Sequence, residues 1–315
     1  MWGNIEKRGT LVFVTCVMIF SLLEPRLSVA AEVHCLSKLE NPSDKRLTLR
    51  QWPAGFQPAM GACWEGYLEG PIVPGDYEKV RNFMRTHHKT LGSFSLNSPG
   101  GNVLEALKIG RLFRRYLISA TAPFYTALGN LSFTTLRHPN GNDFLCGSDG
   151  GNLDDCTCAS ACALIWLGAV KRYGSAGFHR PRIVDPQFVN MSPSDASAVY
   201  RDILRMVEVY MEEMEAPRAL TDLMISTSSA DLKWVSGDDE GFRKPPSISE
   251  WLDAGCGAAS QEEIITQKEL WAKEKAGQIN SREQMLKRLL DSKFQDKFQC
   301  ETLLLHNHRV ELEAP

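Results

Sequence analysis

Residues 156–181, CTCASACALIWLGAVKRYGSAGFHRP, constrain the fold of this chain more than any other stretch. Ser160 stands at the head of an apolar run that ends at residue 170, and His179 follows after a turn and a short apolar segment. A helix N-terminus carries unpaired backbone N–H groups and a partial positive charge, which suit a nucleophile and a developing oxyanion. The stretch therefore predicts a helix that begins at a serine and a site for acyl chemistry. The alternative is a buried helix that the serine merely caps.

The first residues indicate export. A charged start precedes a mostly apolar run over residues 11–23, and small residues then lead up to Ala31. This order is typical of a secretory signal peptide, so we expect cleavage after Ala31 and a secreted or periplasmic protein. The apolar run is shorter than the roughly 20 residues that a membrane-spanning helix needs. An uncleaved membrane anchor is the less favoured alternative.

Net charge and cysteine content argue against a nucleic-acid-binding protein and in favour of a protein with disulfides. The net charge of −3 offers no basic surface for nucleic acid. Cys16 lies in the expected leader and eight cysteines follow it, an even number that favours disulfides in an exported chain. Four of them are close together in the sequence: Cys146, Cys156, Cys158 and Cys162. A metal cluster there is disfavoured because paired C-x-x-C elements are missing, so we expect no metal. Instead we expect a disulfide from Cys158 or Cys162 to Cys146 or Cys156, beside Ser160.

The N-terminal half predicts alternating strands and helices after a polar lead-in over residues 32–62. We expect a helix over 76–86, a strand over 93–96, a helix over 103–113 and a strand over 118–121. The turn at residues 97–101, Asn-Ser-Pro-Gly-Gly, requires its glycines and brings bare backbone N–H groups to a strand end. It has neither the dinucleotide-binding nor the Walker pattern, and we expect no cofactor.

The C-terminal half predicts helices. Residues 140–155 form a Gly- and Asp-rich loop, and Ser192-Pro193 begins a helix. Another helix is expected over 217–224, and Pro245-Pro246 marks a break. Capping boxes at Ser260 and Ser281 predict charged helices over 261–276 and 282–298, followed by a polar tail in which residues 306–308 have no metal role.

Four motifs carry a resemblance to a known family: residues 96–101 (LNSPGG), 159–163 (ASACA), 177–181 (GFHRP) and 234–236 (WVS). In this order they resemble the Clp peptidase and crotonase superfamily, most closely its exported Clp-peptidase-like members, over residues 63–241. The resemblance implies an α/β fold with a ββα spiral core, and it makes a homo-oligomer an expectation. We accordingly divide the chain into a signal peptide (1–31), a lead-in (32–62), a Clp peptidase/crotonase-like domain (63–245) and a helical C-terminal extension (246–315).

The resemblance also implies roles for individual residues. Ser160 would be the nucleophile, His179 its general base, and the backbone N–H groups of Gly101 and Ala161 the oxyanion hole. The serine and the histidine lie closer together in the sequence than in the Clp peptidase, which puts the reach of His179 in question. A third residue that orients the histidine is left open among Asp222, Ser228, Ser229 and Asp231. Pairing of Ser160 with Lys171 is a further alternative, although a lysine beside an arginine after a helix is typically a surface charge.

These observations predict an exported serine hydrolase, a peptidase that acts on polypeptide segments through an acyl-enzyme. The alternative is a non-catalytic binding module on the same scaffold, which holds a peptide or acyl ligand. A crotonase-type enzyme for acyl thioesters fits less well, because its usual coenzyme is intracellular and the required pair of acids is not evident. Catalysis predicts that Ser160 and His179 lie within hydrogen-bond reach of each other.

Overall fold

The computed structural model of the protein describes residues 30–38, 59–123, 136–137, 143–144, 156–182, 190–237 and 242–312. Within these ranges no helix has both the length and the apolar character needed to cross a membrane. Residues 1–29 of the expected signal peptide (1–31) lie outside the described residues. Cys146 and most of the expected loop at 140–155 also lie outside them.

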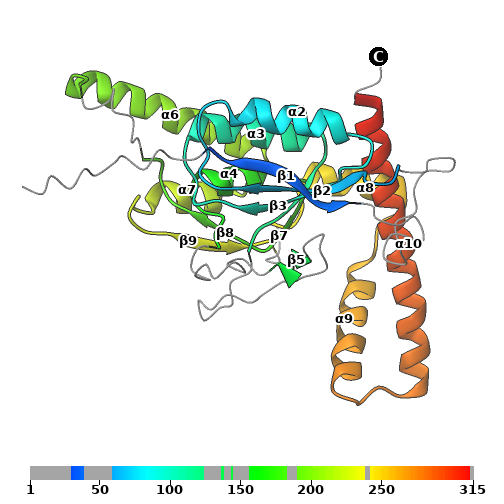
Figure 1. Ribbon diagram of the computed structural model, residues 1–315. Coiled ribbons are helices and arrows are strands. Elements are labelled where there is room, and N and C mark those ends of the chain that lie inside the picture. The colour runs from blue at the N-terminus through cyan, green and yellow to red at the C-terminus, as the bar shows by residue number, and fades with distance from the viewer. Residues whose placement is uncertain are drawn as a thin grey trace, which may run out of the picture.

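A five-stranded sheet lies at the centre of the protein (Figure 1). Its strands in spatial order are β1 (Glu32–Lys38), β2 (Cys63–Glu69), β3 (Ser93–Asn97), β4 (Ser119–Thr121) and β7 (Lys171–Tyr173). Strand β1 is antiparallel to β2, and the other neighbouring pairs are parallel. Parallel neighbours need crossover connections, which helices provide here. The predicted α/β class is confirmed.

The expected lead-in over residues 32–62 is wrong in part, because residues 32–38 form strand β1. A register shift after Cys35 interrupts the regular pairing of β1, so its sequence lacks the strict alternation that predicts a strand. A disulfide between Cys35 and Cys63 joins β1 to the first residue of β2. Residues 39–58 of the expected lead-in lie outside the described residues.

Three helices contribute, together with the sheet, to the main hydrophobic core of the described residues. They are α2 (Asp76–His87), α3 (Val103–Arg115) and α4 (Ala161–Gly168). Helix α3 begins where the Asn102 side chain accepts the Glu105 N–H at 3.0 Å, a regular cap. All eight residues of α4 are buried, which matches the uniformly apolar sequence after Ser160. The predicted bounds of α2 and α3 agree with the structure to within two residues.

Among the described residues, two smaller sheets and two helices also belong to this part of the chain. Strand β8 (Ser175–Phe178) pairs antiparallel with β9 (Lys233–Ser236), and β5 (Leu136–Arg137) pairs with β6 (Asp143–Phe144). Helix α6 (Pro193–Glu213) begins at the predicted Ser192 cap, whose side chain accepts the Asp195 N–H. Helix α7 (Arg218–Ser226) follows, close to its predicted range.

The last three helices are α8 (Pro246–Cys256), α9 (Gln261–Lys275) and α10 (Ser281–Leu312). Figure 1 shows α9 beside the first half of α10, in a hairpin that extends away from the sheet. The predicted capping box at Ser260 is confirmed, with Glu263 as its partner. A second disulfide, between Cys256 and Cys300, fastens α8 to α10.

Helix α10 differs from its prediction at both ends. Its first turn is capped by Asn280, which exchanges two 3.0 Å hydrogen bonds with Glu283, and not by the predicted box at Ser281. It also continues to Leu312 through the segment expected to be a polar tail. The physical reason is tertiary packing, because Glu301, Leu305, His306 and Arg309 are buried there.

Candidate active site

Ser160 lies at a sharp turn between a short extended segment and helix α4. In this segment Cys158 forms a parallel bridge with Ser98, and Ala159 forms one with Gly177. The Ser98 carbonyl accepts the Ala159 N–H at 3.1 Å, and the Gly177 carbonyl accepts the Ser160 N–H at 2.8 Å. Ser98 directly follows β3 and Gly177 belongs to β8, so both segments fix the serine at the carboxyl end of β3. In open α/β sheets this is the end at which ligands bind.

The conformation of Ser160 distinguishes it from a capping serine. Its φ is 57° and its ψ is −120°, and its side chain makes no capping hydrogen bond to α4. Ser192 and Ser260 also precede helices, but their φ angles are −63° and −71° and each accepts a backbone N–H. The alternative of a serine that merely caps a buried helix is therefore wrong. A serine with a strained backbone between a strand and a helix is how α/β-hydrolases present a nucleophile.

The turn after β3 places Gly100 directly against Ser160. Gly100 has φ 101°, and a Cβ built on it would lie 2.6 Å from the Ser160 Cβ. Gly101 has φ 139°, and a Cβ there would lie 2.2 Å from the Ile72 carbonyl oxygen. Neither the Gly101 N–H nor the Ala161 N–H donates a hydrogen bond to any residue that the structure describes. These are the two donors that the family resemblance implies for an oxyanion hole.

His179 directly follows β8, two residues after the Gly177 that pairs with Ala159. Its Nδ1 lies 2.7 Å from the Arg180 carbonyl oxygen. A carbonyl oxygen only accepts, so Nδ1 carries the proton and Nε2 is the basic nitrogen of the neutral ring. That tautomer suits a general base. Among the described contacts, no hydrogen bond joins His179 to Ser160.

The four candidates for a third catalytic member do not orient His179. They are Asp222, Ser228, Ser229 and Asp231, and none of them hydrogen-bonds the histidine within the described residues. Asp222 instead pairs with Arg218 at 3.1 Å on the exposed surface of α7. The recorded partner of the His179 ring is instead the Arg180 carbonyl oxygen, and the backbone N–H of Arg180 donates to the Thr227 carbonyl at 3.1 Å. A backbone oxygen has no sequence signature, so residue patterns could not have found it.

Lys171 is not a base for Ser160. It begins β7 and pairs in register with Ser119 at the start of β4, whereas the segment before Ser160 pairs with Ser98, beyond the carboxyl end of β3. Its Nζ lies 2.5 Å from Glu301 Oε2, and both side chains are almost fully buried. Arg172 has no exposed surface and donates to four backbone carbonyls. The expectation that Lys171 is a surface charge is thus wrong, because Glu301 of α10 provides a buried partner for it.

A disulfide between Cys158 and Cys162 encloses Ser160. The expectation that one of these cysteines pairs with Cys146 or Cys156 is wrong, since they pair with each other. The alternative of a four-cysteine metal cluster fails for the same reason: two of its four thiolates are consumed. Pairing across four residues fits the turn at the start of α4, where the chain reverses sharply enough to bring both Cα atoms to 5.1 Å.

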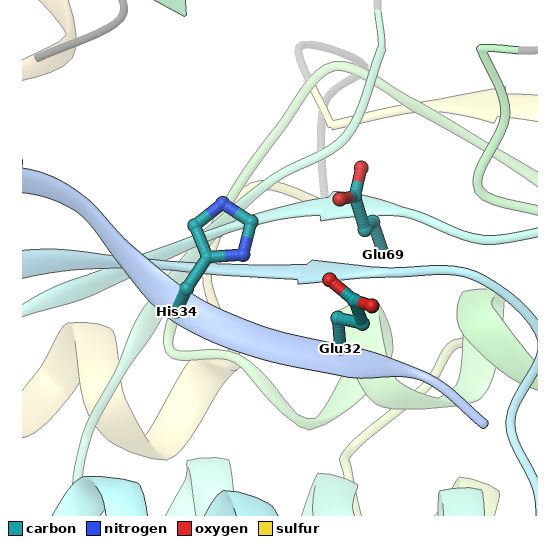
Figure 2. A group of neighbouring side chains, drawn as sticks. All are labelled: Glu32, His34 and Glu69. Carbon is teal, nitrogen blue, oxygen red and sulfur yellow. The ribbon is translucent and has the colours of Figure 1, made fainter.

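Glu32, His34 and Glu69 are a group of potential metal ligands on β1 and β2. One ligand atom from each lies within 4.8 Å of the others, and Figure 2 shows the three side chains on neighbouring strands. The β1–β2 register places Glu32 opposite Glu69, and His34 lies two residues further on the same face of β1. Carboxylate and imidazole ligands suit Zn²⁺ or Mn²⁺. The group shares no residue with the serine site.

A cavity of about 260 Å³ lies between the central sheet and α10. The first residues of three strands, Ser93, Ser119 and Lys171, line it together with His306 and Arg309 of α10. Burial, more than the nearby Arg309, lowers the pKa of His306 to about 4. No residue of the serine site lines this cavity, so it has no part in acyl chemistry at Ser160.

Fold and site together define an α/β protein with a strained serine, a histidine on the adjoining strand β8 and two backbone N–H groups that donate to no described residue. No family model and no curated protein matches the chain. Among solved structures, a mutant of the 1510-N membrane-bound stomatin-specific protease is similar with a TM-score of 0.35 and 15% sequence identity. The alignment covers 61% of this chain and 83% of that one. A likeness at this level establishes neither fold nor activity, so both are argued from the geometry of the protein itself.

Proposed function

We propose that the protein is an exported serine peptidase on a Clp peptidase/crotonase-like ββα core, with Ser160 as its nucleophile. The observation that carries the proposal is the conformation of Ser160, which has positive φ, makes no side-chain cap and lies against Gly100. The N–H groups of the adjacent residues Gly101 and Ala161 donate to no residue that the structure describes. Strain of this kind costs about 1–3 kcal/mol and persists where the surrounding structure imposes it, most often at functional sites.

The proposed reaction begins when Ser160 Oγ attacks the carbonyl carbon of the scissile bond. His179 Nε2 takes the hydroxyl proton, and the Gly101 and Ala161 N–H groups stabilise the oxyanion. Collapse of the tetrahedral intermediate transfers the proton from His179 to the leaving amine and leaves an acyl-enzyme, which water hydrolyses by the same steps. The Arg180 carbonyl keeps the imidazole in the required tautomer. Because this carbonyl is neutral, it stabilises the imidazolium less than a carboxylate does, and we expect slow turnover.

We take the substrate to be a polypeptide segment, because residues 96–101, 159–163 and 177–181 resemble the motifs of exported Clp-peptidase-like proteins. The second candidate function is a binding module that holds a peptide or acyl ligand without cleaving it. One observation favours this second candidate: no hydrogen bond joins Ser160 and His179 among the described contacts.

Labelling of the purified protein with a fluorophosphonate probe separates the two functions, because the probe reports an activated serine without a known substrate. We expect wild type to be labelled and both Ser160→Ala and His179→Ala to lose the label. Ser192→Ala is the matched control, since Ser192 also precedes a helix but serves as its cap. Loss only in Ser160→Ala would assign the base to another residue. A folded wild type that resists labelling would favour the binding module.

A further inference from the structure

The carboxylate of Asp76 is fully buried at the start of α2 and lies against the beginning of β1. Its Oδ2 accepts the Val73 N–H at 2.8 Å and the Ala31 N–H at 3.3 Å. Its Oδ1 accepts from Lys79 Nζ at 2.8 Å, although half of the Lys79 side chain is exposed. Burial of a carboxylate is costly unless charged partners compensate for the lost water. A second cation at the Ala31 nitrogen would improve this compensation.

The sequence before β1 contains a candidate cleavage site, and cleavage there would create a new N-terminal ammonium group. Small residues at Ser28 and Ala30 stand three and one positions before the Ala30–Ala31 bond, the pattern at which signal peptidases cut. Cleavage one bond later, after Ala31 as the sequence alone suggested, would remove a residue that is 1% exposed and packed in the core. It would also remove the 3.3 Å hydrogen bond to Asp76.

We propose that processing cuts the Ala30–Ala31 bond and that the new α-ammonium group of Ala31 forms an ion pair with the buried carboxylate of Asp76. A signal peptidase catalyses this hydrolysis, which consumes one water molecule. The carboxylate stays on Ala30, and the amine of Ala31 takes up a proton, as α-amino groups do at neutral pH. The inference rests on the export that the proposed function includes.

The same carboxylate connects the new terminus to the oxyanion hole. Asp76 holds Val73, and the neighbouring Ile72 brackets the Gly-Gly turn: its N–H donates to the Gly100 carbonyl and its carbonyl accepts the Asn102 N–H, both at 2.8 Å. Gly101 lies between these two bonds. An ammonium donates a shorter and stronger hydrogen bond to a carboxylate than an amide does. Processing therefore strengthens the anchor of the segment that fixes Gly101.

The test begins with the mature N-terminus. The full chain is expressed in a host that exports it, and intact mass with N-terminal sequencing identifies the first residue of the purified protein. We expect Ala31. A mature chain that begins at Glu32 or elsewhere, or one that keeps its leader, would overturn the proposal.

The second measurement compares the protein that begins at Ala31 with a form one residue longer, which begins at Ala30. In the longer form the Ala31 nitrogen is an amide that can still donate to Asp76, whereas the charged α-ammonium group is on Ala30. We expect its melting temperature to be lower by about 3 °C or more. In the Asp76→Asn background this difference should vanish. Equal melting temperatures of the two forms would refute the ion pair.

Neither readout requires an active Ser160, so these results stand apart from the labelling experiment. If the Asp76→Asn variant fails to fold, the comparison of the two N-termini in the wild-type background still decides the question. Ala30→Gly in the longer form serves as a control for the added residue, because it keeps the extension and changes only a side chain. We expect it to melt with the longer form.

Discussion

Ser160→Gly should stabilise the protein relative to Ser160→Ala although both abolish labelling. The φ of 57° at Ser160 is unfavourable for any residue with a Cβ, at about 1–3 kcal/mol. Alanine keeps this strain and glycine releases it. Glycine in turn costs about 0.5–1 kcal/mol because it gains more freedom in the unfolded chain. The difference is therefore about 1 kcal/mol in favour of glycine, or roughly 2–4 °C in melting temperature.

Ala272→Gly is the matched control for this comparison. Ala272 lies exposed within α9, where the backbone is helical and no strain can be released. There the change from alanine to glycine should destabilise by about 0.5–1 kcal/mol. Urea denaturation with the disulfides intact measures both differences. If glycine is worse than alanine at residue 160 by the same amount as at residue 272, the argument from backbone strain is refuted.

Three further results are expected. Gly101→Ala should lose probe labelling in a folded protein, because its Cβ would displace the Ile72 carbonyl that lies 2.2 Å from the built position; unchanged labelling would exclude Gly101 from the site. Replacement of Cys158 and Cys162 by alanine should slow labelling on the order of tenfold or more while the fold persists by circular dichroism, and an unchanged rate would show that the disulfide does not position Ser160. Burial holds the pKa of His306 at about 4, below its unfolded value of about 6.5. The stability that neutral His306 contributes is therefore fully present above pH ~6.5 and decreases by about 2.5 kcal/mol by pH ~4.5, a loss that urea titrations should not find in His306→Gln.

Local patterns predicted the elements that position the site. The Gly-Gly turn after β3, the cap of α6 and the fully apolar α4 each follow from short-range rules, and the structure has them near the expected residues. Ser160 at the head of α4 was likewise evident from the abrupt change to apolar residues. Its positive φ was not, because a strained backbone is imposed by neighbours from other parts of the chain.

Long-range partners account for what the sequence did not show. Lys171 has the pattern of a surface charge, and only its contact with Glu301, far away in the chain, explains its burial. The extension of α10 through His306 likewise depends on tertiary packing, which buries Leu305 with Leu117 and Val170 despite the polar composition of this segment. The Arg180 carbonyl that orients His179 is invisible to any analysis of side chains.

The Cys158–Cys162 disulfide connects strain and chemistry at the serine. Its loop is much shorter than that of Cys256–Cys300, with sequence separations of 4 and 44 residues. In the chain-entropy model these loops correspond to about 2 and about 4 kcal/mol of stabilisation. The short disulfide thus stabilises the fold less than the long one does. Its contribution is nevertheless similar to the ~1–3 kcal/mol of backbone strain at Ser160. It closes the turn on both sides of the strained residue, where it offsets the cost of holding the serine out of a capping geometry.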